Sequence, residues 1–218
     1  GDLLIVDVGG GTTDVHSLGS GSPSKAGVVP RGLPEPYAKR TVEGDLGMRV
    51  SVLPLVEAIN PAVFARDLNW EQEKVEKRAR ELSARPELLP QNPEEVAFDH
   101  ALGYRAVHLA VGRHVGRLSE LYTPSGLVWM QDGKDLSPVN KVIGTGGVMV
   151  NSQHAHSMLK GAEQQPETPL ELRPERPRYF LDGKYILAPM GLLAEDYPEV
   201  ALKILKDSLN DHELARRD

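Results

Sequence analysis

The chain contains no cysteine, which excludes disulfide bonds, thiolate metal sites and a cysteine nucleophile. This absence fits a reducing compartment, and we expect a cytoplasmic protein. Long apolar runs are also lacking: stretches such as Leu3–Val6 and Tyr185–Pro189 are far shorter than the roughly 20 residues of a membrane helix, so we expect no membrane span. Lysine and arginine form no run and the net charge is −6, which disfavours a nucleic-acid partner.

An initiating methionine and a signal sequence are missing as well, so we interpret the chain as a piece of a longer protein. Its 218 residues, 40% of them hydrophobic, suffice for one sizeable core with an appended subdomain. We predict a nucleotide-binding lobe from residues 1–59 and 98–210, a mostly solvated helical insert at 60–97, and a polar tail at 211–218.

Short apolar runs that end at turn residues predict the strands. Leu3–Val8 is a continuous apolar run ending at glycines, which is typical of a central strand buried on both faces. Asp14–Leu18 and Tyr37–Glu43 are expected to continue as a three-stranded antiparallel start, joined by a flexible connection at residues 19–36. Further strands are expected at Asn140–Ile143 and Tyr185–Ala188.

Helical periodicity predicts the remaining elements. Leu46–Ile59 favours a helix with Leu46, Val50, Leu53 and Val56 on one side and a kink at Pro54. The longest periodic segment, Asp99–Leu121, has a core stripe of Tyr104, Val107, Val111, Val115 and Leu118. Shorter helices are expected at Ser152–Gly161 and Pro198–Leu209. These patterns together predict an α/β fold, a mixed sheet flanked by helices.

The first candidate site follows the first strand. Glycines at the strand end let an anion approach the backbone N–H groups, so we expect Gly9, Gly10 and Gly11 to cradle phosphate, with hydroxyl donors from Thr12 and Thr13. Asp7 is the candidate for holding Mg²⁺ through water, and Asp14 for positioning water or supporting the turn, so both are candidate catalytic residues. The alternative is a simple hairpin turn. No Gly-Lys-Ser/Thr follows, so this is not a Walker loop.

Two further glycine turns are candidates for ligand contact. Gly144, Thr145, Gly146 and Gly147 follow the strand at Val142–Ile143 and lead towards a helix, where they are expected to take the adenosine. Gly44 lies between Glu43 and Asp45, where the backbone could approach ribose or phosphate. Equally, Asp45 can be a helix N-cap and Gly47 a packing glycine.

These motifs carry a resemblance. In their order, the motifs at 7–14, 43–45 and 143–147 resemble the second lobe of the actin, sugar-kinase and heat-shock-chaperone ATPases. The amino-acid sequence of residues 6–17, 40–49 and 142–148 resembles the MutL/GlmL family more closely still. Members of that family are encoded beside cobalamin-dependent glutamate mutase and aminomutases. They are unrelated to the mismatch-repair protein of the same name. The resemblance covers Asp2 to about Leu205.

The resemblance implies a ribonuclease H-like, actin-type lobe that binds ATP with Mg²⁺. It further implies a chaperone-like ATPase that reactivates a cobalamin-dependent mutase, the partners being that mutase and an N-terminal lobe absent here. The alternatives are a small-molecule kinase of the same superfamily and an actin-like scaffold without turnover. We expect the fragment alone to bind ATP weakly with little turnover, since catalysis needs both lobes.

The histidines are the remaining candidates. His154 and His156 have no third ligand nearby in the sequence, so we interpret them as a solvated helix start and assign no metal site. His108 and His114 lie among arginines on the long predicted helix, where an exposed or interface face is expected.

Overall fold

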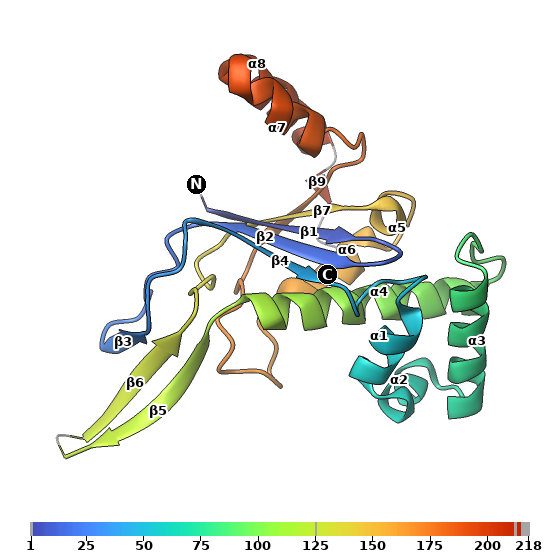
Figure 1. Cartoon of the computed structure of the whole chain (residues 1–218), viewed down its shortest axis with the longest axis horizontal. Helices are drawn as coiled ribbons and strands as arrows, with labels where there is room; N and C mark the ends of the chain where they lie inside the picture. Colours follow the sequence, from blue (N-terminus) through green and yellow to red (C-terminus); the bar gives the residue numbers. More distant parts are fainter. Residues whose placement is uncertain (1, 125, 212, 215–218) are drawn as a thin grey trace.

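The computed structural model describes residues 2–124, 126–211 and 213–214, and its main element is a six-stranded sheet (Figure 1). In spatial order the strands are β4 (Ala38–Glu43), β2 (Thr13–Leu18), β1 (Leu3–Val8), β7 (Lys141–Thr145), β8 (Arg178–Leu181) and β9 (Glu213–Leu214). The pairs β4–β2, β2–β1 and β8–β9 are antiparallel, whereas β1–β7 and β7–β8 are parallel. The expected antiparallel start and mixed α/β sheet are therefore confirmed.

Helices cover this sheet and extend beyond it. They are α1 (Val52–Ile59), α2 (Pro61–Leu68), α3 (Gln72–Ala84), α4 (Pro93–His114), α5 (Gly147–Val150), α6 (Ala155–Leu159), a 3-10 turn η1 (Lys160–Ala162), α7 (Leu187–Asp196) and α8 (Pro198–Asp211). The longest, α4, runs beneath the sheet (Figure 1) and begins where the Asn92 side chain accepts the Glu95 N–H at 3.0 Å. Within the described part of the chain, none of the helices is long and apolar enough to cross a membrane.

Buried apolar side chains join the sheet to α4. Leu4, Val6 and Val8 alternate with less buried residues along β1 and are fully buried. They share one core with residues such as Leu102 and Val107 of α4. Removing this apolar surface from water, at about 25 cal/mol per Å², stabilises the packing of α4 on the sheet. It also fixes the end of β1, where the first glycine loop begins.

Residues 60–97 are largely helical, as expected from their composition. α2 and α3 pack beside α1 and the start of α4, where Phe98 meets Phe64 edge-on at 5.3 Å and stacks on Trp70 at 5.6 Å. Since α4 already begins at Pro93, this region and the lobe share one continuous helix. The division into domains stays a prediction.

A second sheet forms an arm that projects away from the main sheet (Figure 1). Its strands, in spatial order, are β3 (Val28–Arg31), β6 (Gly126–Asp132) and β5 (Arg117–Thr123). The long helix was expected to continue to Leu121, and this is wrong, because α4 ends at His114. Gly116 then packs so tightly that a Cβ there would lie 2.7 Å from the Asp132 carbonyl oxygen.

The predicted helix at Leu46–Ile59 is also wrong in its first half. Helical structure begins only at Val52, and Val50 and Leu53 are 64% and 42% exposed rather than part of a core stripe. The reason is that the preceding backbone hydrogen-bonds to the first glycine loop instead. Pro54 lies in the first turn of α1, where its missing N–H has no helical partner to lose, so it causes no kink.

The last part of the chain differs most from expectation. The strand expected at Tyr185–Ala188 is wrong: Tyr185 has a φ of +53° and α7 begins at Leu187. Both Ile186 and Leu187 donate their N–H groups to the Asp182 carboxylate, at 2.9 and 3.1 Å, which starts the helix there. Of the predicted polar tail, residue 211 ends α8 and residues 213–214 form β9, while 212 and 215–218 lie outside the described residues.

Candidate functional site

The first glycine loop is a tight turn between β1 and β2. Its ends are fixed because Gly9 donates its N–H to the Thr12 carbonyl at 2.9 Å. Among the described residues, the N–H groups of Gly10, Gly11 and Thr12 donate no hydrogen bond. Consecutive free N–H groups in a turn form an anion-binding nest. The loop therefore offers three adjacent backbone donors to a ligand such as phosphate.

The carbonyl groups of the same loop are already bonded to the segment before α1. Met48 N–H donates to Gly9 O at 3.0 Å, Arg49 N–H to Gly10 O at 2.9 Å, and Ser51 Oγ to Gly11 O at 2.7 Å. This pairing holds the loop rigid and leaves donors rather than acceptors available, which suits an anion.

Thr13 supports the loop from within the core. It is fully buried and its hydroxyl donates to the Leu46 carbonyl at 2.7 Å. The structure therefore uses the Thr13 hydroxyl for the fold, although it was predicted to contact ligand. Thr12 is partly buried and lies at the turn itself.

The second glycine loop lies beside the first because β1 and β7 are parallel neighbours. Asp7 and Thr145 are register partners, so both strands end at the same edge of the sheet. Gly146 has a φ of +97°, and a Cβ there would lie 2.6 Å from Asp7 Oδ1. Glycine is thus required twice over at this position, by conformation and by space.

A cavity of about 770 Å³ adjoins both loops. Of the predicted ligand-binding residues, Gly9, Gly10 and Gly147 line it. The other lining residues come from the segment before α1, the α3–α4 connection, α4 and the region of α5 and α6: Arg49, Pro86, Leu89, Pro90, Val96, Asp99, His100, Val148, Asn151, Ser152, Gln153, His154 and Met158, together with Val8. The volume is in the range of small-molecule sites.

The other predicted glycine positions are not brought to this cavity. Gly144 is buried in β7, where a Cβ would lie 2.7 Å from the Met149 sulfur, so it serves packing. Gly44 is exposed with open space around it. The carboxylates on either side of Gly44 both pair with Arg113 at 2.7 Å, and this hydrogen bonding lowers the pKa of Asp45. Thr145 lies against Asp182, its hydroxyl donating at 3.4 Å.

The predicted catalytic carboxylates gather at the strand ends, outside the lining of the cavity. Burial, with the nearby Asp14 and Asp182 charges, raises the pKa of Asp7. Asp14 Oδ1 is buried and has no hydrogen-bond partner among the described residues, while Oδ2 lies 3.5 Å from Arg40. Such under-compensated carboxylates fit a hydrated Mg²⁺. No group of three or more potential ligands for direct coordination occurs within the described chain.

Two residues of this carboxylate side were missed by the sequence analysis. Asp182 follows β8 and accepts the N–H groups of Ile186 and Leu187 at the start of α7, and the Tyr185 hydroxyl lies 3.5 Å from where a Gly147 Cβ would be. Burial, with Asp7 and Asp182, raises the pKa of Tyr185. Asp182 could have been recognised from the sequence, because the apolar run Tyr179–Leu181 is followed by Asp-Gly. This repeats the pattern of the first motif, in which a strand ends at an aspartate.

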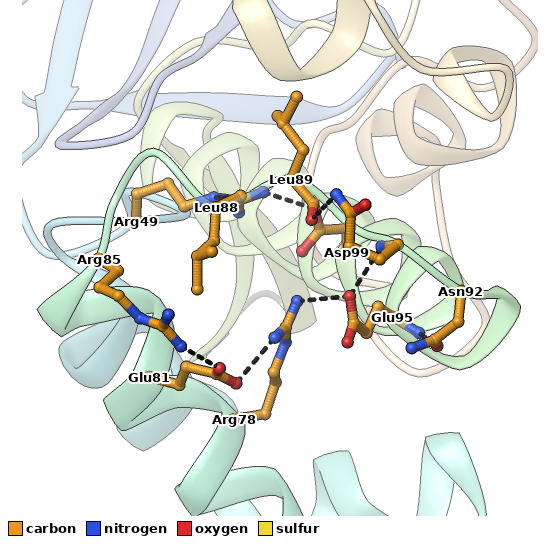
Figure 2. Close-up of polar contacts among 10 residues, drawn as sticks. Arg49, Arg78, Glu81, Arg85, Leu88, Leu89, Asn92, Glu95 and Asp99 are labelled. Atoms are coloured by element: carbon orange, nitrogen blue, oxygen red, sulfur yellow. Dashed lines mark hydrogen bonds and ion pairs between the residues drawn. The ribbon is translucent and has the colours of Figure 1, made fainter.

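Polar contacts join the segment before α1, α3 and α4 (Figure 2), and two of the residues involved, Arg49 and Asp99, line the cavity. The Arg49 guanidinium donates to the Asp99 carboxylate at 2.5 Å and to the Leu88 carbonyl at 3.3 Å. Further along, Arg78 on α3 pairs with Glu95 on α4 at 3.1 Å. Burial raises the pKa of Asp99, although the Arg49 charge opposes that shift. The first loop, the α3–α4 connection and α4 are thereby tied together.

The histidines match expectation only in part. His154 is exposed and directly precedes α6, as expected of a solvated helix start, and it also lines the cavity and stacks on His100 with ring centroids 4.9 Å apart. The expected exposed face for His114 is wrong, since it is fully buried, with Nδ1 2.9 Å from Thr41 Oγ1 and Nε2 2.9 Å from Ser17 Oγ. His108 is partly buried.

Comparison with known proteins gives one family. A family model described as "MutL protein" matches residues 1–209. Protein MutL of Clostridium tetanomorphum is 46% identical over 209 residues, which is 96% of this chain and 45% of the relative. The chain thus spans less than half the length of this curated relative.

Proposed function

Because the chain belongs to the MutL family, we propose that it is the nucleotide-binding lobe of a longer, actin-type ATPase that uses ATP with Mg²⁺. The observation that carries the proposal is the first glycine loop, whose three adjacent N–H groups at Gly10, Gly11 and Thr12 donate no hydrogen bond within the described residues. A polyphosphate supplies acceptors for such donors.

The arrangement of the strands supports the proposal at the level of the fold. Three antiparallel strands precede a long helix and two parallel strands, giving the order β4-β2-β1-β7-β8. This order is what we expect of a ribonuclease H-like lobe. The two glycine loops come from neighbouring strands and adjoin one cavity, so a single nucleotide can contact both.

The roles of the residues follow from their chemistry. The N–H groups of Gly10, Gly11 and Thr12 bind phosphate oxygens, and Gly147 borders the nucleoside. Asp7 and Asp14 hold and orient water molecules around Mg²⁺, which when bound neutralises phosphate charge. Arg49 stays paired with Asp99 and keeps the loop and the cavity wall in position.

The partner proposal rests on the family resemblance. The lobe works with the remainder of its parent protein, and nucleotide-dependent closure acts on a cobalamin-dependent mutase to restore its activity. Because phosphoryl transfer depends on groups positioned from both sides, the chain by itself binds ATP weakly and turns over negligibly.

Calorimetric titration of Mg·ATP tests the binding proposal. The unmodified chain is compared with Gly10→Val/Asp7→Ala and with the matched control Gly44→Val, since a Cβ at Gly10 already meets Arg49 at 3.4 Å whereas Gly44 has open space. We expect binding by the unmodified chain and the control, and its loss in the double variant. Equal heats for all three, or no heat at millimolar ATP from the unmodified chain, would count against a phosphate cradle in this lobe.

The partner proposal needs the full-length protein. An inactivated cobalamin-dependent mutase should regain activity when the full-length protein and Mg·ATP are added, and should not when ATP is replaced by ADP. Recovery that does not depend on nucleotide would contradict a reactivating ATPase.

A further inference from the structure

A second cavity continues from the first around a pair of histidines. This outer cavity has a volume of about 620 Å³ and shares Pro90, Val96, His100 and His154 with the inner one. None of the glycine-loop residues lines the outer cavity. The histidine pair therefore lies where the two cavities meet, whereas the first glycine loop lines only the inner one.

The two rings form a stacked surface from separate elements. His100 is on α4 and His154 immediately precedes α6, and their planes differ by 29° at a centroid distance of 4.9 Å. Ser157 fixes both, because its hydroxyl donates to the His154 carbonyl at 2.9 Å and lies 2.7 Å from His100 Nε2. Since that hydroxyl proton is used, Nε2–H of His100 is the donor, and Nδ1 is left as an acceptor.

The surroundings of the pair suit a flat, uncharged ring system. Leu89, Pro90 and Val96 provide apolar surface beside it. Burial and the neighbouring His154 lower the pKa of His100, so the ring that stacks on His154 is neutral near pH 7. The described residues that line the outer cavity include no lysine or arginine, so this end offers no cation to pair with phosphate. The cavity thus has one end for an anion and one end for an aromatic ring.

We propose that the His100–His154 pair is the stacking platform for the purine base of the bound nucleotide, an inference that rests on the proposed nucleotide binding. The base stacks on the imidazole surface, and His100 Nδ1 is an acceptor for an exocyclic amino group. The platform gives the site its preference for nucleotides over simple polyphosphates.

The test compares Mg·ATP with Mg·tripolyphosphate, which has phosphates but no base, binding to the full chain. Affinities are measured by NMR titration, with the histidine ring C–H signals as the readout. For the unmodified chain we expect ATP, and not tripolyphosphate, to shift the His100 and His154 signals. His154→Ala should lower ATP affinity about five- to tenfold and leave tripolyphosphate affinity unchanged. His154→Phe, which keeps a flat ring, should retain ATP affinity.

The outcomes separate the two proposals. If ATP binds but His154→Ala leaves its affinity unchanged, or weakens both ligands equally, the platform is overturned and nucleotide binding stands. If neither ligand binds the unmodified chain, both proposals fail. Circular dichroism and thermal unfolding of each variant check that the folded state is retained.

Discussion

The backbone N–H of Arg49 donates to the Gly10 carbonyl at 2.9 Å, while the Arg49 side chain reaches Asp99 on α4. One residue therefore joins the first glycine loop to α4, and both of these elements line the cavity. The segment that carries Arg49 approaches the loop closely: a Cβ on Gly47 would lie 2.5 Å from the carbonyl oxygens of both Gly10 and Gly11.

Gly47→Ala should therefore destabilise the protein and displace the loop. The added methyl group has no space against backbone atoms, and overpacking of this kind costs about 1–3 kcal/mol. Thermal unfolding should show a Tm lower by several degrees, together with weaker Mg·ATP binding. Gly44→Ala, at a position with open space, is the matched control and should leave both quantities unchanged. A wild-type Tm for Gly47→Ala would show that the segment can move away freely.

Arg49→Met should destabilise the protein by removing the partner of a buried carboxylate. The side chains of Arg49 and Asp99 are each only 10% exposed, and loss of one member of a buried pair costs roughly 3–5 kcal/mol. Denaturant unfolding should show this decrease in the free energy of unfolding for Arg49→Met. The double variant Arg49→Met/Asp99→Leu should recover much of the lost stability. The comparison pair is Arg105 and Asp67, which is more exposed, so Arg105→Met should cost less than about 1 kcal/mol. If Arg49→Met and Arg105→Met lowered the free energy of unfolding equally, the Arg49–Asp99 pair would not behave as a buried ion pair.

Stability should fall as the pH is lowered, because of buried His114. Burial, with nearby Lys39 and Lys134, lowers the pKa of His114 from 6.5 to about 3. Below pH 6.5 the His114 imidazole binds a proton in the unfolded chain but stays neutral in the folded protein. The free energy of unfolding therefore decreases from pH 6.5 towards pH 3. One such group contributes a slope of about 1.4 kcal/mol per pH unit in that window.

His114→Gln keeps a donor and an acceptor for Ser17 and Thr41 but cannot be protonated in this range. Urea unfolding between pH 7 and pH 4.5 should therefore show a shallower slope for the variant. His108, whose pKa burial lowers to about 4, should contribute in the same direction. The assignment fails if the slopes of the unmodified protein and His114→Gln coincide.

Asp7→Asn should raise stability and weaken nucleotide binding. Burial and the Asp14 charge raise the pKa of Asp7, so its ionised form is disfavoured in the folded protein at neutral pH. Removing the charge should raise the Tm in the absence of Mg²⁺, while Mg·ATP affinity falls roughly tenfold or more. Asp207→Asn, on an exposed part of α8, controls for net charge. A lower Tm for Asp7→Asn would contradict the view that burial and the Asp14 charge disfavour an ionised Asp7 in the folded protein.

The sequence predicted the elements whose signal is local. The apolar run at β1 and the glycine turns after β1 and β7 give the strands and place the two loops. The long helix was recognised, but its periodicity continued through Val115 and Leu118, which belong to the chain beyond the helix. What ends α4 is the close approach of Gly116 to Asp132, a contact between distant residues that periodicity does not record.

The candidate site divides in the same way. The glycines of the first loop were predicted because residues adjacent in the sequence form the whole motif. Asp182 and His154 were not predicted, because tertiary structure places them at the site. Asp182 follows β8, which pairs with β7, and His154 stacks on His100 of α4. His114 was expected on an exposed face because its sequence neighbours are arginines, yet the sheet covers it.

The pairing of β1 with β7 has a consequence for the order of folding. β2 follows β1 directly, but the other edge of β1 stays open until β7 has been synthesised at Lys141–Thr145. At typical translation speeds this interval is on the order of ten seconds. During it, α2, α3 and the β5–β6 hairpin can form from local contacts, while the open edge of β1 is available for wrong pairing. A chaperone that covers this edge on the ribosome would therefore raise the yield of folded protein.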